Sequence, residues 1–219
     1  RARAFSPGWL ENASIWLHME YKYLLELLKS GLYDKFYEAV EKALVPFLDP
    51  EVYGRSILEN SSFIMSSLNN DQKNHGRGYI ARLSGSTAEY INMWSMMNFG
   101  SNPFNCENGE LNFKPNPLLK GELFTKEEKD ICLQLSEDKK KCYNIEANSY
   151  ACRFLAKTLL VYHNPDRKNS YGKDKAEIRR YKLINKSGEI ITREAESLKG
   201  STAEKLRDGE FERIDIYLN

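Results

Sequence analysis

The apolar positions of the first fifty residues repeat at the spacing of a helix. Two sets of such positions follow one another along the chain: Leu17, Tyr21, Leu24 and Leu28, then Phe36, Val40, Ala43 and Phe47. Positions three or four apart share one helix face, so each set predicts an amphipathic helix. Gly31 lies where a residue just past a helix end is expected, and Pro50 disfavours helical backbone in the residue before it. We therefore predict two helices that form an antiparallel hairpin.

Residues 51–83 show no sustained period and are rich in Ser, Asn and Gly. We predict a long loop here that could contain a short helix around Phe63. Long loops in compact domains often have a function. Apolar positions return after this loop and predict a third helix from about Thr87 to Phe99, with Gly100 just past its end.

After Pro103 the pattern changes to the alternation that is typical of strands. One predicted strand covers residues 150–162, and residues 211–218 alternate in the same way. Two further runs, 178–184 and 189–192, flank a short turn that contains a glycine and predict a hairpin. Helices in the first half and strands in the second predict an α+β protein whose second half is a β-sandwich. The charged stretch from Lys126 onward is predicted to be a solvated insertion, which could form a helix.

The composition fits a folded protein and excludes several classes of partner. Hydrophobic residues make up 41% of the 219 positions and aromatic residues 12%, which is enough for a buried core. The 32 basic and 31 acidic residues leave a formal net charge of +1, so nothing favours nucleic acid or an anionic membrane as a partner. No apolar run approaches the roughly 20 residues that span a bilayer. The start of the chain lacks the apolar core of a signal peptide and an initiator Met, so we expect the natural N-terminus upstream.

All four cysteines lie in the second half of the chain, and none forms a C-x-x-C pair. They are Cys106, Cys132, Cys142 and Cys152. We predict scattered reduced thiols, because the spacing supports neither a zinc site nor a disulfide framework. Reduced thiols fit a cytoplasmic location.

The segment 85–89, G-S-T-A-E, is the first candidate binding site. Ser86 and Glu89 form a capping box, which predicts that a helix begins here. A helix N-terminus offers unpaired N–H groups and a partial positive charge, and the hydroxyls of Ser86 and Thr87 add donors, so the segment could hold a phosphate. An ordinary helix cap explains the same residues. Residues 200–204 repeat the pentapeptide, so the motif alone does not identify a site.

Three histidines are candidates for polar roles. His18 lies early in the first predicted helix and off its apolar face, where it could donate to a phosphate or simply bond a neighbour. His75 and His163 lie beside turn residues, and we predict that both belong to surface turns.

Carboxylates and tryptophans give weaker signals. Glu11 precedes the first predicted helix, where it could accept hydrogen bonds from sugar hydroxyls or favour the helix dipole. Glu59 is ambiguous in the same way, and spacing selects no acid and base pair. Tryptophan rings could stack on sugars, although core packing explains each of Trp9, Trp16 and Trp94. The sequence contains no P-loop, HExxH or GxSxG motif.

Three stretches carry a resemblance to a known family. Residues 3–13 are R-A-F-S-P-G-W-L-E-N-A, residues 53–64 are Y-G-R-S-I-L-E-N-S-S-F-I, and residues 82–88 are R-L-S-G-S-T-A. They resemble the cellobiose and chitobiose phosphorylases, inverting glycoside phosphorylases in which the first pattern is roughly R-x-F-x-P-G-x-K-E-N-G/A and then a histidine. The later two stretches resemble less-studied phosphorylase-like members in particular. The resemblance is strong over about residues 1–105 and looser beyond them.

The resemblance implies a fold and a division of the chain. Residues 1–105 would be the C-terminal helical hairpins of an α/α barrel. Residues 106–219 would be a small antiparallel β-sandwich, with the charged insertion near 125–148.

The resemblance also implies a reaction, the inverting phosphorolysis of β-glucosides to a sugar 1-phosphate by an enzyme of the glycosyltransferase class in carbohydrate metabolism. An aspartic acid protonates the leaving oxygen while inorganic phosphate attacks C1 from the opposite face. Phosphate replaces the activated water of an inverting hydrolase, so no second carboxylate is needed. No cofactor and no metal are expected, and inorganic phosphate is the co-substrate.

Carried over residue by residue, the resemblance names a phosphate site and a sugar contact. His18 takes the place of a phosphate-contacting histidine, and Gly85 with Ser86 or Thr87 takes the place of a phosphate loop. The family loop commonly reads T-G-T-A and this chain has one extra residue, so the choice of hydroxyl stays open. Glu11 takes the place of a glutamate that binds the acceptor sugar, although the family's neighbouring lysine is leucine here.

The resemblance places the general-acid aspartate and the phosphate-binding arginines upstream of Arg1. We therefore expect no catalytic residue in this chain and no turnover by the chain alone. The implied partners are a β-linked glucoside or oligosaccharide, inorganic phosphate, the upstream part of the same protein and a second copy in a homodimer. No nucleic acid or membrane partner is expected.

Two alternatives to the enzyme stay open. The altered phosphate loop and Leu10 favour a non-catalytic carbohydrate-binding or structural module with the same fold. Glu11 with His18 seven residues later favours the enzyme. A helical scaffold for partner proteins would bind neither phosphate nor sugar.

Overall fold

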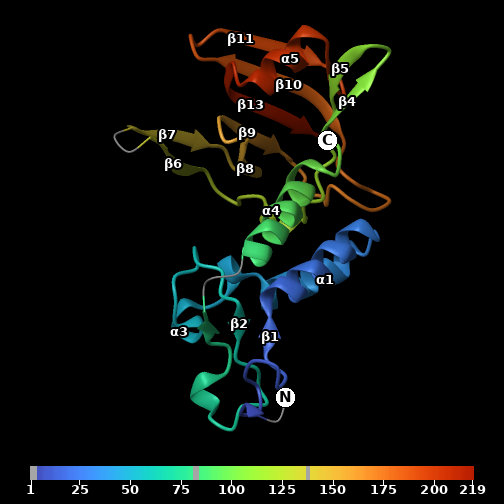
Figure 1. The fold of residues 1–219 in the computed structure, drawn as a ribbon. Helices are drawn as coiled ribbons and strands as arrows, with labels where there is room; N and C mark the ends of the chain where they lie inside the picture. Colours follow the sequence, from blue (N-terminus) through green and yellow to red (C-terminus); the bar gives the residue numbers. More distant parts are fainter. Residues whose placement is uncertain (1–3, 81–83, 137–138) are drawn as a thin grey trace. The chain divides into compact units, whose positions relative to one another are not determined.

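The structure is a computed structural model that describes residues 4–80, 84–136 and 139–219. The chain divides into two compact units, unit 1 (Arg1–Met97) and unit 2 (Asn98–Asn219). Figure 1 colours the elements of both units in chain order.

A helical hairpin forms the first part of unit 1, as the apolar pattern predicts. Helix α1 is Leu17–Lys29 and helix α2 is Tyr33–Ala43. The predicted face of α1 is buried, and its members are Leu17, Tyr21, Leu24 and Leu28. Gly31 follows α1 with a φ of 72°, which glycine adopts at little cost because it has no Cβ.

The second helix is shorter than predicted. Helix α2 ends at Ala43, and a 3₁₀ helix, Val45–Phe47, follows it. Pro46 lacks an N–H and disfavours helical backbone in the residue before it, so α2 cannot continue. The side chain of Phe47 is therefore 45% exposed, and its prediction as a core position is wrong.

Short strands organise the segment that was predicted to be a loop. Strands β1 (Ile15–Trp16), β2 (Phe63–Ile64) and β3 (Gly78–Tyr79) form an antiparallel sheet in this order. A short helix, α3, lies at Pro50–Tyr53. Phe63 begins a strand, so the short helix expected around it is wrong.

Unit 1 is not a set of helical hairpins from an α/α barrel, and this prediction is wrong. The described residues of the whole chain contain five α-helices. After the hairpin of α1 and α2, the chain returns through β2 and β3 before α4 (Ser84–Phe99). The intervening segment is rich in turn-forming residues and lacks a helical period, so it supplies no further pair of long helices.

A five-stranded sheet lies at the centre of unit 2. Its strands in spatial order are β11 (Ile190–Glu194), β10 (Ile178–Asn185), β13 (Phe211–Leu218), β9 (Thr158–His163) and β8 (Ser149–Phe154). Strand β13 runs parallel to β9, whereas the other neighbours are antiparallel. The sheet is mixed, so the predicted antiparallel sandwich is wrong. The alternation of apolar and polar residues predicts which face of the sheet each side chain lies on. It does not predict whether the neighbouring strand is parallel or antiparallel.

Several predicted strands are confirmed, and one is two strands. The hairpin of β10 and β11 and the last strand, β13, lie where the alternation predicts them. Residues 150–162 form the hairpin of β8 and β9 and not one strand. The chain reverses at Leu155 and Ala156, whose φ values are 48° and 56°. Leucine and alanine rarely adopt a positive φ, so their residue types do not predict a turn here.

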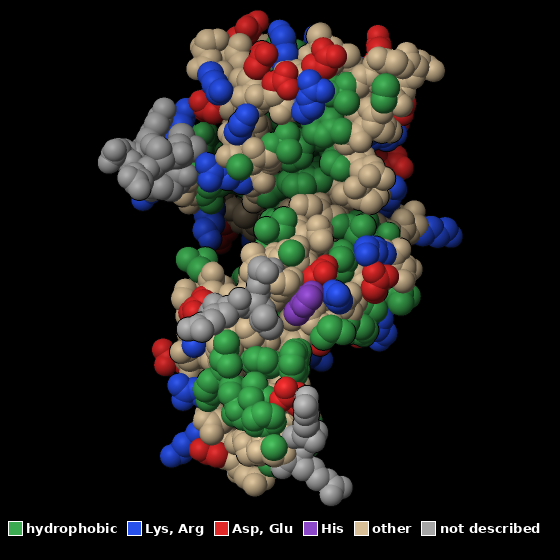
Figure 2. All heavy atoms as spheres, viewed as in Figure 1, with side chains coloured by type: hydrophobic (Ala, Val, Ile, Leu, Met, Phe, Trp, Pro, Cys, Tyr) green, Lys and Arg blue, Asp and Glu red, His purple; other side chains and the backbone are tan. Residues whose placement is uncertain are grey.

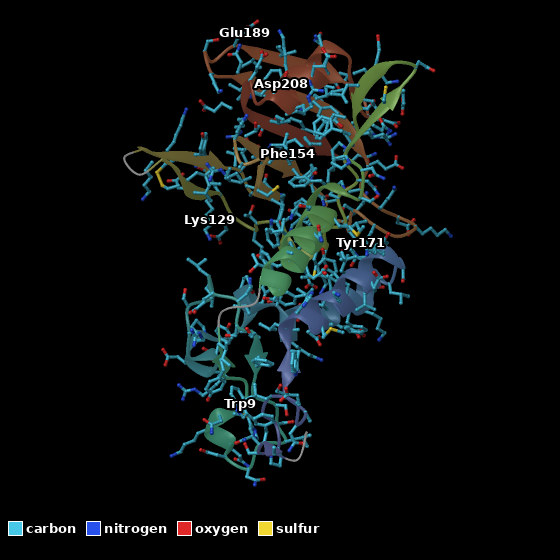
Figure 3. The ribbon with its side chains drawn as sticks, viewed as in Figure 1. Trp9, Lys129, Phe154, Tyr171, Glu189 and Asp208 are labelled. Carbon is cyan, nitrogen blue, oxygen red and sulfur yellow. A yellow bond between two sulfur atoms is a disulfide. The ribbon has the colours of Figure 1, made fainter. Side chains whose placement is uncertain are left out.

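A smaller sheet and an aromatic core complete this part of unit 2. Strands β12 (Leu198–Lys199), β5 (Glu110–Phe113) and β4 (Phe104–Glu107) pair in this order, and helix α5 (Ser201–Asp208) follows β12. Phe154, labelled in Figure 3, is 2% exposed. Its ring lies 4.8 to 5.9 Å from those of Phe99, Phe104 and Phe113.

The charged insertion is a β-hairpin and not a helix. It consists of β6 (Lys129–Ser136) and β7 (Lys139–Ile145). Ile131, Leu133 and Tyr143 pack against a buried cluster of Ile145, Leu159 and Val161. Cys132 and Cys142 are paired in register and joined by a disulfide, so the prediction of four reduced thiols is wrong. Cys106 and Cys152 are free.

Candidate functional site

His18 and Gly85 lie in contact in unit 1. His18 is the second residue of α1, and Gly85 is the second residue of α4. A Cβ on Gly85 would lie 2.5 Å from Nδ1 of His18 and 2.6 Å from Cε1. A Cβ at this position would displace the His18 ring, because real Cβ contacts are longer. The structure thus brings together two of the predicted site residues, which are 67 positions apart (85 − 18).

The three-stranded sheet explains why His18 and Gly85 lie in contact. At one end of the sheet, the backbone N–H of Leu17 donates to the carbonyl of Ser62, and the N–H of Ser62 donates to the carbonyl of Ile80. Helix α1 begins at this end, directly after β1. Helix α4 begins four residues after Ile80. The ends of β1 and β3 therefore start both helices in the same neighbourhood.

Ser86 is not the helix cap that the capping box predicts, because α4 begins two residues earlier, at Ser84. The first N–H groups of an α-helix have no partner within the helix, and in α4 they include those of Ser84 and Gly85. Ser86 is fully buried, whereas Thr87 is exposed. Of the two predicted hydroxyls, that of Thr87 is the one that solvent reaches.

Glu89 faces His18 from the second turn of α4. Its Oε1 lies 3.7 Å from Nε2 of His18, and the two side chains are 18% and 34% exposed. The site therefore combines a helix N-terminus, a histidine and a carboxylate. The carboxylate takes up part of the positive potential at this helix N-terminus.

Glu11 makes no contact with this group among the described residues. It is exposed, in a turn that the bridge between Trp9 and Asn12 closes. Among the described residues, no contact joins its side chain to His18 or Gly85. Glu59, the other carboxylate, is engaged by Arg55 at 2.6 Å.

The tryptophans of unit 1 are packing residues. The ring of Trp9 lies 4.8 Å from that of Tyr79, and the ring of Trp16 lies 4.5 Å from that of Phe63. Both pairs meet edge to face, a common packing arrangement. Trp94 stacks on Tyr90 along α4 at 5.9 Å. Figure 2 shows hydrophobic side chains gathered on one face of this unit.

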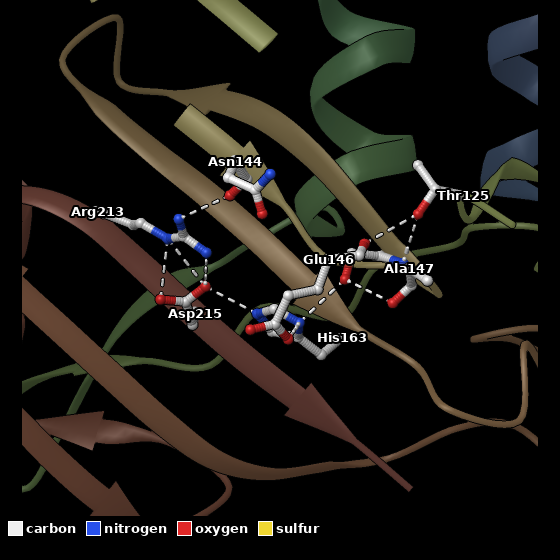
Figure 4. A network of polar contacts seen from close by, with 8 residues as sticks. Thr125, Asn144, Glu146, Ala147, His163, Arg213 and Asp215 are labelled. Carbon is white, nitrogen blue, oxygen red and sulfur yellow. Dashed lines mark hydrogen bonds and ion pairs between the residues drawn. The ribbon is translucent and has the colours of Figure 1, made fainter. Parts of the chain in front are cut away.

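A polar network in unit 2 was missed from the sequence (Figure 4). His163 lies in strand β9 and is 6% exposed, so its prediction as a surface turn residue is wrong. Its Nε2 lies 2.8 Å from Asp215, and its Nδ1 lies 3.0 Å from Oγ of Ser149. Arg213 donates to both carboxylate oxygens of Asp215 and to the carbonyl of Asn144. By contrast, His75 lies in a turn as predicted, after the 3₁₀ helix Gln72–Asn74.

The network contains a serine, a histidine and an aspartate, but its geometry is that of a structural cluster. A nucleophile must reach its substrate, and Ser149 is fully buried. Asp215 is also held by Arg213. Burial alone would raise the pKa of Asp215, but the hydrogen bonds from His163 and Arg213 outweigh it and hold the pKa below its ordinary value. The network ties β8, β9, β13 and the β6–β7 hairpin together.

No protein-family model matches the chain, and no curated protein matches it. Within residues 4–80, 84–136 and 139–219, no group of three or more His, Cys, Asp or Glu side chains is placed to hold a metal ion. In the same described part, no helix has the length and apolar character to cross a bilayer.

Proposed function

We propose that this chain contributes the phosphate site of a carbohydrate-active enzyme that performs inverting phosphorolysis of β-glucosides to a sugar 1-phosphate. One observation carries the proposal: the ring of His18 lies against Gly85 at the N-terminus of α4. The sequence resemblance assigns these residues to phosphate, and their contact is what a shared ligand requires. The proposal rests on this pair and needs no barrel of helical hairpins.

The chemistry of the pair suits an anion. Unpaired N–H groups and the helix dipole favour a negative charge by about 0.3–1 kcal/mol at an exposed helix N-terminus. A histidine N–H adds a hydrogen bond that is stronger when it is charge-assisted. Thr87 is the hydroxyl that the proposal assigns to phosphate, because Ser86 is fully buried and already has a contact of its own.

In the proposed reaction, a phosphate oxygen forms a bond to C1 while the glycosidic C1–O bond breaks. The leaving oxygen takes a proton from an aspartic acid that lies outside this chain. His18 and the first turn of α4 hold the phosphate on the face opposite the leaving group. Glu11 is assigned to the acceptor sugar, which lies on the other side of C1.

The remaining parts of the proposal concern context. The proposed partners are a β-linked glucoside, inorganic phosphate, the upstream part of the protein and a second copy. The proposed compartment is the cytoplasm. Thiols are kept reduced there, so the state of Cys132 and Cys142 after rapid acid quenching of cells tests this location.

The direct experiment measures phosphate-dependent release of sugar 1-phosphate from a panel of β-linked glucosides. It uses the longest polypeptide that contains this chain, with the variants His18→Ala and His75→Ala. His75 is the matched control, since it lies in unit 1 and its Nε2 contacts the carbonyl of Asn69. We expect release that needs phosphate, falls by at least about 100-fold in His18→Ala and persists in His75→Ala. Sugar binding without release would instead support the carbohydrate-binding module.

Glu89 gives a second, opposite test of the same site. Its carboxylate competes with phosphate for His18, so Glu89→Gln should strengthen phosphate binding by about two- to threefold. Isothermal titration with inorganic phosphate measures this change. Weaker phosphate binding in Glu89→Gln would show that the carboxylate supports the site and does not compete with it.

A further inference from the structure

Unit 1 contains a cavity that the proposed phosphate site does not use. It has a volume of about 560 Å³ and lies among α1, α2, α3 and β2. Its apolar lining includes Leu17, Ala43, Leu48, Val52, Ile64 and Met65. Sites for small molecules have this size and this mainly apolar lining, with a few polar groups that fix the ligand.

Glu20 supplies the polar group that distinguishes this cavity. It lies on α1, lines the cavity and is half-buried. Burial raises the pKa of its carboxyl, and within the described residues no hydrogen bond or ion pair of Glu20 is found. By contrast, Glu26 on the same helix pairs with Lys29 at 2.8 Å, and Glu38 on α2 pairs with Lys35 at 2.9 Å. A carboxylate that is partly desolvated without a partner is costly.

The other charged groups of the cavity leave an excess of negative charge. Asp49 and Lys42 line it together with Glu20. One oxygen of Asp49 is occupied by the N–H of Glu51 at the start of α3. His75 lines the cavity too, and its Nε2 contacts the carbonyl of Asn69. Two carboxylates thus face one ammonium, which favours a cationic ligand.

We propose that this cavity binds a small organic cation with an apolar body, such as an alkyl amine, whose ammonium group pairs with the carboxylate of Glu20. The apolar body would cover the aliphatic lining, and the ammonium would supply the partner that Glu20 lacks. Phosphate does not suit this cavity, because Glu20 and Asp49 repel anions. The cavity is also separate from His18, since residues two apart on a helix do not face each other.

Three matched probes test the proposal: hexylamine, hexanol and hexanoate, which share one alkyl chain and differ in charge. Their binding is measured by saturation-transfer NMR and isothermal titration on the wild-type chain, Glu20→Gln and Glu26→Gln. We expect hexylamine to bind most tightly to the wild type. Glu20→Gln should weaken hexylamine by about fivefold and leave hexanol unchanged. Glu26→Gln, the control on the same helix, should behave as the wild type.

A cavity-filling variant locates the binding. Ala43→Leu places extra carbon atoms in the lining and should weaken all probes that bind, while circular dichroism confirms that the chain remains folded. The proposal is overturned if hexanol binds as tightly as hexylamine, if Glu20→Gln leaves hexylamine unaffected, or if no probe binds. Binding that survives in a folded Ala43→Leu variant also overturns it, because the probe would then lie elsewhere.

Discussion

The pentapeptide G-S-T-A-E occurs once in each unit and begins a different local structure in each. In unit 1, α4 starts before it, so Gly85 is the second helical residue. In unit 2, α5 starts within it, so Gly200 is the N-cap. The buried residues differ as well: Ser86 is buried and Ala88 exposed, whereas Ser201 is exposed and Ala203 buried. The surrounding fold, and not the pentapeptide itself, therefore determines where each helix begins.

The side chains nearest to the two glycines also differ. Gly85 meets the imidazole of His18, whereas the nearest side-chain atoms to a Cβ on Gly200 belong to the carboxylate of Glu110, at 4.0 Å. The Glu110 carboxylate therefore lies near the N-terminus of α5, where it disfavours the binding of an anion. An imidazole thus lies against Gly85, whereas a carboxylate lies nearest to Gly200.

Each unit also pairs a histidine with a carboxylate, and the two pairs differ in burial. His18 and Glu89 are 3.7 Å apart and partly exposed. His163 and Asp215 are 2.8 Å apart, and their side chains are 8% and 2% exposed. A pair that water reaches is available to a ligand, while a closed pair contributes to stability. The comparison supports the proposal that the pair in unit 1 binds a ligand, and it gives the pair in unit 2 a structural role.

The largest effect is expected from a substitution that breaks the buried pair of His163 and Asp215. Asp215→Ala should destabilise unit 2 by about 3–5 kcal/mol, because Arg213 loses the partner of its buried charge. Glu89→Ala should cost less than about 1 kcal/mol. Hydrogen exchange of the β9 and β13 amides in urea measures the first, and tryptophan fluorescence measures the second, since all three tryptophans lie in unit 1. Equal costs in the two variants would contradict the comparison.

Reduction of the Cys132–Cys142 disulfide should have the next largest effect. The bridge spans 10 residues, and opening a loop of this size costs about 2–3 kcal/mol. We expect dithiothreitol to speed hydrogen exchange in β6 and β7 and to leave phosphate binding unchanged. The Cys132→Ser, Cys142→Ser double variant should not respond to the reductant. A loss of phosphate binding on reduction would show that the units are not functionally separate.

Substitution of the two glycines sharpens the comparison directly. Gly85→Ala and Gly200→Ala should each cost about 1–3 kcal/mol, the first by displacing His18 and the second by strain at φ 54°. Phosphate affinity should fall by at least about tenfold in Gly85→Ala alone. Isothermal titration measures the affinity. An equal loss in Gly200→Ala would assign phosphate to both helix starts.

Acid should produce the smallest change and affect unit 2. The pKa of Asp215 is lower in the folded chain than its ordinary value, so the folded state binds fewer protons here than the unfolded state. This stabilisation is present above about pH 4 and is lost as the pH falls through the folded pKa. Urea midpoints at pH 7, 4 and 3 should fall more steeply for the wild type than for Asp215→Asn. Parallel profiles would contradict this contribution.

The sequence predicts the long elements well and the short ones poorly. Helix α1 and strand β13 have enough residues to show a period, whereas β1, β2 and β3 have two residues each. No period can be read from two residues, so the sheet that places His18 near Gly85 could not be predicted from the sequence. The barrel was expected from resemblance alone, and no helical pattern in residues 51–83 supports it.

Contacts between distant residues explain the other failures. His163 precedes Asn and Pro, which suggests a turn, yet it is the last residue of β9. Its partners Ser149 and Asp215 become neighbours through strand pairing that alternation does not specify. The disulfide depends in the same way on the register of β6 and β7. The resemblance assigned His18 and the Gly85 segment to phosphate from two separate stretches, and no pattern in the sequence predicted that they touch.

The most direct test of the account is a ¹H–¹⁵N NMR titration of the chain with inorganic phosphate. The account predicts saturable shifts of the Gly85, Ser86 and Thr87 amides and of the His18 ring, with no saturable shift at Gly200, Ser201 or Thr202. Those shifts should disappear in His18→Ala. Equal shifts at both pentapeptides, or none at Gly85 while the chain is folded, would contradict the assignment of phosphate to this site.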